Sequence, residues 1–259
     1  MAGGERVLYE VMDGVAHVTL NRPEKRNALD DRTVEELRSV LEEAERDDAV
    51  RVILLRGAGQ DFCAGADLAQ LEKVAAGTGP IENLDDAASL GSLLIRMRRL
   101  SKPIVAAVHG HAFAGGAGLA TACDLVLASD GARFGYPEVH LGFVPAMVMA
   151  LLRRVCGEKV AFELVARGDR IDAEEARRIG LVNRIFADET FEDDAREYAR
   201  ELASRSPMAL RLIKRLFYGI DGASFEEAIA RGAEVNVLAR MTDDTREGVR
   251  RFLEKRSGA

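Results

Sequence analysis

The sequence predicts an α/β fold with largely parallel strands, for two reasons. Short apolar runs typical of buried strands alternate with stretches of helical periodicity up to about Glu189. Beyond that residue the periodicity is helical only. We therefore expect a core unit over residues 1–188 and a helical C-terminal subdomain over residues 189–259.

The chain opens with a predicted β-hairpin. Strands over residues 7–12 and 15–20 flank Asp13-Gly14, a dipeptide suited to a tight turn with positive φ. A helix is predicted from Thr33, because Thr33 and Glu36 fit a capping box and apolar residues recur at helical spacing. Its expected buried face consists of Val34, Leu37, Val40, Leu41 and Ala44.

Four later strands are predicted from apolar runs bounded by charge or turn residues. They are "VRVILLRG" (50–57), "PIVAAV" (103–108), "DLVLAS" (124–129) and "LVNRIF" (181–186). Helices are expected to end near Leu100 and at Gly180, and the segment "AAGTGPIEN" (75–83) is predicted as a loop because it contains Gly and Pro. The C-terminal helices are expected over 191–204, 207–218, 225–240 and 243–256.

Composition and charge exclude several classes of function. Hydrophobic residues make up 47% of the 259 residues and charged residues 31%, the balance of a soluble globular protein. The formal net charge of −7 argues against nucleic acid or an anionic membrane as the main partner. No signal-peptide core or apolar run of roughly 20 residues is present, so we expect a cytoplasmic protein.

The sequence shows no pattern typical of a metal site or a serine hydrolase. Cys63, Cys123 and Cys156 are widely spaced and form no CxxC, so we expect reduced packing residues. His109 and His111 stand two apart, not at the i, i+4 spacing of a helical metal pair. No GxSxG is present either.

Two strand–turn–helix segments rich in small residues are the strongest candidates for chemistry. In "GQDFCAGADLAQL" (59–71) the amides of residues 64–68 are expected to point outward, and "HGHAFAGGAGLATACD" (109–124) repeats this pattern with a helix from Gly115 or Gly116. On neighbouring strands, two such turns would place two backbone donors together, as in an oxyanion hole. Plain tight connections fit the spacing equally well, whereas a phosphate loop lacks its GxGxxG or GxxxxGK[ST] signature.

Several motifs together resemble the crotonase superfamily of enoyl-CoA hydratases and isomerases. They are "LNRPEKRNALD", "FCAGADL", "HGHAFAGGAGLATACDLVLAS", "ARFGYPEVHLGFVP", "GEKVAFELVARGDRIDAEEARRIGLVNRI" and "EGVRRFLEKR". The resemblance implies a crotonase-like spiral of ββα units with a C-terminal helical trimerisation region. It also implies an acyl-CoA thioester substrate and a homotrimer or a hexamer formed as a dimer of trimers. Coenzyme A is then part of the substrate, so no separate cofactor is expected.

The resemblance carries catalytic roles to three positions. The oxyanion amides belong to Ala66 and Gly115, and Glu138 in "FGYPEV" is the acid and base. Hydratases of this family commonly have a second glutamate where this chain has Gly118, which we expect to leave space beside the acyl chain. One carboxylate must then both orient water and transfer the proton, or else move a proton between two carbons.

The remaining predicted site residues bind the substrate. Arg26 and the backbone of Ala28 match positions that border the nucleotide of CoA, and Phe252 and Lys255 match tail positions that reach the CoA of a neighbouring subunit. A solvated basic helix face is the alternative for the tail. Asp67 is either a second carboxylate or, as we favour, a helix cap. Around the thioester and acyl group we expect Ala64, Asp67, Leu68, Phe113, Pro137, Leu141 and Phe143.

The leading functional hypothesis is an enoyl-CoA hydratase that adds water across the α,β double bond through an enolate. The alternatives are an isomerase that converts 3-enoyl-CoA to 2-enoyl-CoA and a hydratase of branched glutaconyl-CoA. A noncatalytic trimer that binds CoA esters or RNA is a more remote hypothesis.

Overall fold

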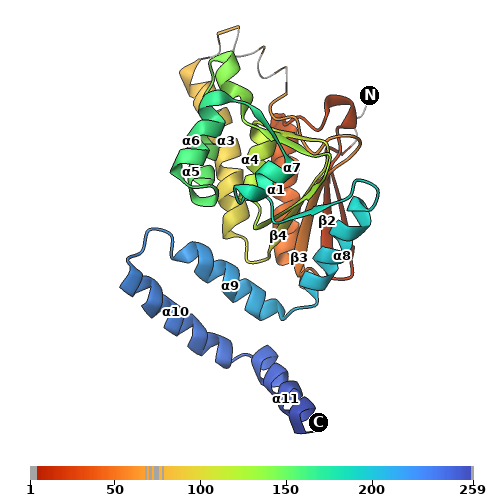
Figure 1. The fold of residues 1–259 in the computed structure, drawn as a ribbon, viewed down its shortest axis with the longest axis vertical. Helices are drawn as coiled ribbons and strands as arrows, with labels where there is room; N and C mark the ends of the chain where they lie inside the picture. The colour runs from red at the N-terminus through yellow and green to blue at the C-terminus, as the bar shows by residue number, and fades with distance from the viewer. Residues whose placement is uncertain (1–4, 68, 70–71, 73–75, 78, 258–259) are drawn as a thin grey trace.

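The computed structural model describes residues 5–67, 69, 72, 76–77 and 79–257, so the predicted site residue Leu68 lies outside the described residues. Its centre is a six-stranded sheet in the order β1-β2-β3-β4-β6-β9, beside a small sheet in the order β5-β7-β8 (Figure 1). The strands are β1 (Val7–Met12), β2 (Val15–Leu20), β3 (Val52–Gly57), β4 (Ile104–Val108), β5 (His111–Phe113), β6 (Leu125–Ser129), β7 (Arg133–Gly135), β8 (Arg170–Asp172) and β9 (Arg184–Phe186). From β2 to β9 all neighbours in the large sheet are parallel, which confirms the predicted α/β class.

The N-terminal hairpin forms as predicted. Strands β1 and β2 pair antiparallel, with Met12 opposite Val15. Asp13 and Gly14 both have positive φ, 52° and 79°, the backbone that a two-residue turn between twisted strands requires.

Helix α1 (Asp31–Arg46) begins earlier than predicted, and the predicted capping box is wrong. Asp30 is the N-cap, and its carboxylate accepts a hydrogen bond from the Thr33 N–H at 2.8 Å. Glu36 instead accepts hydrogen bonds from the N–H groups of Arg6 (2.6 Å) and Val7 (3.2 Å) and so ties α1 to β1. The predicted apolar face is buried except for Val40, which is half-buried.

Two other boundaries differ from the prediction. Residues 80–83, predicted as part of a loop, belong to α3 (Pro80–Arg99), because proline fits the first turn of a helix, where its missing N–H costs no hydrogen bond. Strand β9 starts only at Arg184. The N–H groups of Leu181 and Val182 donate to Ala176 O and extend the end of α7 (Ala173–Arg178), which Gly180 closes with a φ of 87°.

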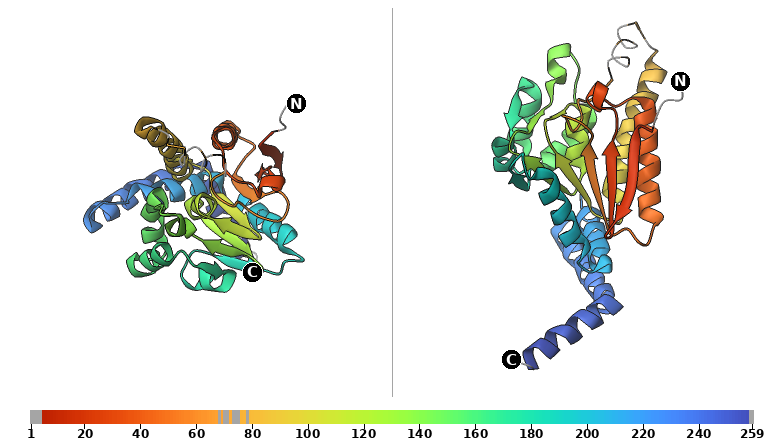
Figure 2. Two further views of the ribbon diagram at one scale, coloured as in Figure 1. Left: turned by 90° about the horizontal axis from the view of Figure 1, so that it is seen from above. Right: turned by 90° about the vertical axis from the view of Figure 1, so that its right-hand side faces the viewer.

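Helices cover both faces of the large sheet (Figure 2). Helices α1, α3 and α4 (Gly115–Ala122) pack on the face that carries Ile53 and Leu55 of β3. Helix α8 (Phe191–Ala203) packs on the opposite face, against Val52 and Leu54. A strand buried on both sides needs a continuous apolar sequence, which is the pattern that predicted it. A third cluster joins α5 (Ala146–Val155) and α6 (Glu158–Arg167) to Tyr136, just before the 3-10 helix η2 (Pro137–Leu141).

The C-terminal helices are α9 (Pro207–Gly219), α10 (Phe225–Arg240) and α11 (Asp243–Ser257), and they extend away from the sheet (Figures 1 and 2). Their positions confirm the helices predicted from periodicity.

Lys214 attaches α9 to the body: its ammonium group donates to Met97 O (2.9 Å) and Lys102 O (3.0 Å) and pairs with Asp124 (2.7 Å). Burial lowers the pKa of Lys214, so these three acceptors are needed to hold its charge.

The three cysteines are free, and Cys63 and Cys123 are buried, which raises the pKa of Cys63 to about 12. Across the part of the chain that the structure describes, no helix combines the length and apolarity needed to cross a bilayer.

Replacing Asp30 with alanine is expected to lower the free energy of unfolding by about 1–3 kcal/mol, because α1 loses its cap and the buried Arg22 loses one partner at 3.2 Å. Urea unfolding followed by circular dichroism measures this. Glu35→Ala is the matched control, because its side chain is 74% exposed and should change stability by less than about 0.5 kcal/mol. Equal losses in both variants would contradict the role given to Asp30.

Candidate active site

Three extended segments run side by side and carry most of the predicted site. The segment around residue 65 pairs with residues 26–29 on one side, since Leu29 N–H donates to Gly65 O at 2.7 Å and Asp67 N–H donates to Leu29 O at 2.9 Å. On its other side it pairs with the start of the second turn, where Phe113 N–H donates to Cys63 O at 3.0 Å. The two glycine-rich turns are therefore neighbours, as the sequence predicted.

The backbones of these turns touch where the predicted donors lie. A Cβ added to Gly65, whose φ is 96°, would come within 2.9 Å of Ala114 Cβ and 3.4 Å of Gly115 N. Gly115 is the first residue of α4, so its N–H has no acceptor within the helix. Among the described residues, neither the Ala66 N–H nor the Gly115 N–H has a hydrogen-bond acceptor. Such a pair of free amides is suited to a negatively charged oxygen.

Glu138 stands close in the fold to these turns. Strand β7 pairs with β5, and Ala114 N–H donates to Gly135 O at 2.9 Å, so η2 starts two residues beyond this contact. The Tyr136 hydroxyl is 2.8 Å from Thr121 Oγ1 of α4 and fixes the start of η2 against that helix.

The Glu138 carboxyl group is half-buried and incompletely bonded. Its Oε2 atom is inaccessible to solvent and has no hydrogen-bond partner among the described residues. Burial raises the pKa of Glu138. A buried carboxylate oxygen without a partner is rare in folded proteins, and it is often found where a ligand or water completes the bonding.

Gly118 has a packing reason to be glycine. A Cβ at this position would come within 2.7 Å of Val148 Cγ2, so a side chain here would require Val148 of α5 to shift. The expected role of Gly118 in leaving space beside the acyl chain stays a prediction.

Asp67 is held in an internal ion pair. Its carboxylate lies 2.7 Å from an Arg22 nitrogen, and Arg22 also contacts Asp30 at 3.2 Å and the Ala28 carbonyl at 2.7 Å. The hydrogen bond from Ala69 N–H and the Arg22 guanidinium keep the pKa of Asp67 low. These contacts favour the structural interpretation of Asp67 over a catalytic one. The charge network around Arg22 was missed by sequence reasoning, because no local spacing links these residues.

Arg26 is oriented by partners far along the chain. Its Nε atom donates to the buried Asp61 at 2.6 Å, and its Nη2 atom lies 2.8 Å from His111 Nδ1. The side chain is nevertheless 55% exposed. Ala28 and Ala64 lie beside it, and Ala64 N–H donates to Arg26 O at 2.9 Å. Asp61 and His111 were not predicted as parts of this cluster, and only their folded proximity reveals it.

The predicted acyl-pocket residues differ in burial. Phe113 is half-buried, with the Arg170 guanidinium 5.0 Å above its ring. Pro137 is half-buried, whereas Leu141 and Phe143 are 67% and 40% exposed.

The two predicted tail residues lie apart from the turns within one chain. Phe252 on α11 is 60% exposed, and α11 extends away from the body (Figure 2). Lys255 belongs to α11, but its side chain lies outside the described residues.

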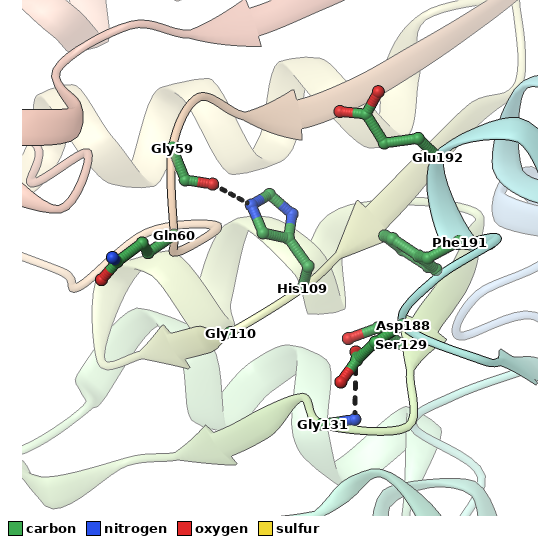
Figure 3. A pocket seen from close by; sticks show the side chains of 9 residues that line it. All are labelled: Gly59, Gln60, His109, Gly110, Ser129, Gly131, Asp188, Phe191 and Glu192. Carbon is green, nitrogen blue, oxygen red and sulfur yellow. Dashed lines mark hydrogen bonds between the residues drawn. The ribbon is translucent and has the colours of Figure 1, made fainter.

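A separate cavity of about 380 Å³ lies at the carboxyl ends of β3, β4, β6 and β9 (Figure 3). It is lined by Gly59, Gln60, His109, Gly110, Ser129, Gly131, Asp188, Phe191 and Glu192, none of which is a predicted site residue. His109 contacts Gly59 O at 2.9 Å, and Asp188 accepts a hydrogen bond from Gly131 N–H at 3.3 Å. Because the free amides and Glu138 do not line it, we place the candidate active site at the two glycine-rich turns.

The chain matches the enoyl-CoA hydratase/isomerase family over residues 10–259. A Thermus thermophilus protein provisionally named an enoyl-CoA hydratase is 45% identical over 242 residues, which cover 93% of this chain and 95% of that protein. The 1,2-epoxyphenylacetyl-CoA isomerase of Escherichia coli is 36% identical, covering 98% and 97%. The crystal structure of a Mycobacterium smegmatis enoyl-CoA hydratase has a TM-score of 0.92 at 31% identity, covering 96% of each chain.

The fold and the paired turns thus define a crotonase-type protein. The chain belongs to the enoyl-CoA hydratase/isomerase family.

Glu138→Gln is expected to stabilise the folded protein at neutral pH. Burial raises the pKa of Glu138 above its value in the unfolded chain, so the folded state binds more protons than the unfolded state between the two pKa values. Stability therefore falls as pH rises through that interval, and glutamine avoids this loss. The variant should unfold at a higher temperature than the wild type at pH 7, and the difference should shrink toward pH 4, near the ordinary glutamate pKa of about 4.3.

Thermal unfolding across this pH range measures the effect. The exposed Glu189→Gln is the control for replacing a glutamate on the surface. A stability gain that grows as the pH falls would have the wrong sign for a carboxyl group with a raised pKa.

Proposed function

We propose that this protein is an enoyl-CoA hydratase, which adds water across the α,β double bond of a 2-enoyl-CoA thioester. The observation that carries the proposal concerns three groups that have no hydrogen-bond partner among the described residues. They are the buried Oε2 of Glu138 and the N–H groups of Ala66 and Gly115 on the two turns. The relatives act on CoA thioesters by their names, which supports the same class of substrate.

In the proposed reaction the N–H groups of Ala66 and Gly115 donate to the thioester oxygen. Glu138 takes a proton from water while the water oxygen bonds to the β-carbon, and the electrons of the double bond move to give an enolate. The amides stabilise this charge because they are oriented before the reaction begins. The protonated Glu138 then delivers its proton to the α-carbon, and the carbonyl re-forms. A pKa raised by burial suits a group that both accepts and donates a proton near neutral pH.

Isomerisation is the second candidate function, because glycine at position 118 leaves a single carboxylate for the reaction. Position 118 carries no second carboxylate, and a side chain there would require Val148 to shift. A single glutamate is sufficient to remove a proton from the α-carbon of a 3-enoyl-CoA and return it to the γ-carbon. The same oxyanion hole would stabilise the enolate in both reactions.

Glu138→Gln is expected to lower kcat for hydration by about 10²–10⁴-fold, the usual contribution of a general acid–base group, with KM changed by only a few fold. The assay follows loss of enoyl absorbance with short, long and branched 2-enoyl-CoA substrates, glutaconyl-CoA types included. Asp67→Asn serves as a comparison, because we assign that carboxylate a structural role.

A parallel incubation with a 3-enoyl-CoA separates the two reactions. Accumulation of 2-enoyl-CoA without hydroxyacyl-CoA would make isomerisation the main activity. Equal inertness of wild type and Glu138→Gln toward all substrates, with CoA-ester binding retained, would refute both and support the noncatalytic hypothesis.

For the CoA moiety we propose Arg26 and the Ala28 backbone as contacts to the nucleotide. Arg26 is exposed and held in position by Asp61, and its segment runs beside Ala64 and Ala66. Phe252 and Lys255 would contribute from a neighbouring subunit, which requires an assembly.

We further propose a homotrimer, or a dimer of trimers, built through the C-terminal helices. Ile213 and Phe217 lie one turn apart on α9 and are 62% and 66% exposed, and Phe225 and Ile229 of α10 are 76% and 60% exposed. Apolar surface of this extent is typical of a buried interface in an oligomer.

Phe217→Glu is expected to reduce the assembly to smaller species, because a carboxylate would be buried in the interface without a partner. Sedimentation velocity measures the mass, and circular dichroism verifies the helix content. Gln60→Glu places the same charge on an exposed body position and should leave the assembly intact. A wild-type protein that sediments as a monomer would contradict the proposed trimer.

A further inference from the structure

Ala114 has the most unusual backbone of the described residues near the two turns. Its φ is 49° and its ψ is −122°, far from the left-handed helical region that single non-glycine residues occupy at positive φ. Asp13, Arg26 and Asn27 also have positive φ. Asp and Asn tolerate this backbone well, whereas alanine has only a methyl group that clashes with its own carbonyl.

The surrounding structure holds Ala114 in this conformation from both sides. Its N–H donates to Gly135 O of β7 at 2.9 Å, and its carbonyl accepts the Gly118 N–H at 2.9 Å in the first turn of α4. The peptide that follows, which carries the Gly115 N–H, therefore has its direction fixed by the strained residue. Strain of this kind persists where neighbouring contacts over-determine the backbone, and such places cluster at functional sites.

The Ala114 methyl group also separates the two turns. A Cβ on Gly65 would lie 2.9 Å from Ala114 Cβ, so the methyl rests directly over the Gly65 backbone, one residue before Ala66. A Cβ on Gly115 would lie 4.0 Å from Gly65 Cα. Between the two segments, which main-chain hydrogen bonds join, the space next to the donors is thus filled by one small side chain.

We propose that Ala114 is a positioning residue for the oxyanion donors: its strained backbone directs the Gly115 N–H, and its methyl group spaces that donor from the Ala66 N–H. This inference rests on the proposed function, since the donors matter only if an oxyanion forms between them. Glycine at position 114 would relieve the strain and remove the spacer, so stability and activity should change in opposite directions.

The test compares Ala114→Gly with the wild type. The variant is expected to unfold at the same or a higher temperature, while kcat for enoyl-CoA turnover falls at least about tenfold and KM stays within about threefold, because donor geometry affects the transition state more than binding. A second readout is the enolate absorbance of a bound 3-oxoacyl-CoA, which should weaken because misaligned donors stabilise the enolate less.

Ala120→Gly is the matched control, since Ala120 is buried in the interior of the same helix without positive φ. It should lower the unfolding temperature and leave kcat and the enolate signal unchanged. Wild-type kcat and enolate absorbance in Ala114→Gly would overturn the inference, and so would a loss of thermal stability as large as that of Ala120→Gly.

Failure of the proposed function can be distinguished from failure of the inference about Ala114. A wild type that turns over no enoyl-CoA refutes the proposed function. The enolate absorbance, measured without turnover, still decides whether Ala114 positions the donors.

Discussion

The contact between Gly65 and Ala114 is the constraint on which the site depends. These two residues are about 50 positions apart in sequence, yet the Gly65 backbone lies next to the Ala114 methyl group. A Cβ added to Gly65 would lie only 2.9 Å from Ala114 Cβ. Parallel pairing of the segments around residues 29, 63 and 112 holds this approach through main-chain hydrogen bonds. Among the described residues, this pairing gives no acceptor to the N–H groups of Ala66 and Gly115, which are the amides proposed to bind the thioester oxygen.

Ion pairs also hold the segments next to the two turns in place. Arg22 links the N-cap of α1 to the turn at Asp67, and Asp61 joins Arg26 to the start of β5. The buried Arg22, Asp61 and Asp67 each pair with an opposite charge, which is a condition under which burial is tolerated. The turns are therefore fixed by both backbone pairing and ion pairs, and rigid donors are what electrostatic stabilisation of an enolate requires.

Glu138, in contrast, has no ion pair among the described residues. Its Oε2 atom has no partner among the described residues, and desolvation raises its pKa. The folded protein thus carries an incompletely bonded carboxylate at the position where proton transfer is proposed. Position 118, where hydratases of this family commonly have a second glutamate, is glycine, and a side chain there would require Val148 to shift. The proposed chemistry therefore uses Glu138 as its single acid–base group.

The sequence by itself determined the elements with strong periodicity and the class of the fold. Strands β3, β4 and β6 and the helices from α8 to α11 follow from apolar runs and helical spacing, because burial on two faces or one face leaves a local pattern. The small-residue turns around Ala66 and Gly115 are also visible in the sequence, whereas the roles proposed for these two residues and for Glu138 come from the family resemblance. Local pattern also misled: the carboxylate of Asp30 caps α1 in place of Thr33.

Only the tertiary structure decided the interactions between distant residues. The pairing of Arg22 with Asp67, the Asp61–Arg26–His111 cluster and the contact of Val148 with Gly118 join residues that no spacing rule relates. The conformation of Ala114 belongs with them, because an alanine adopts a positive φ only when contacts from other strands and helices impose it. Secondary structure is set largely by neighbours in sequence, whereas donor direction, burial of a carboxylate and closeness of two turns depend on packing in three dimensions.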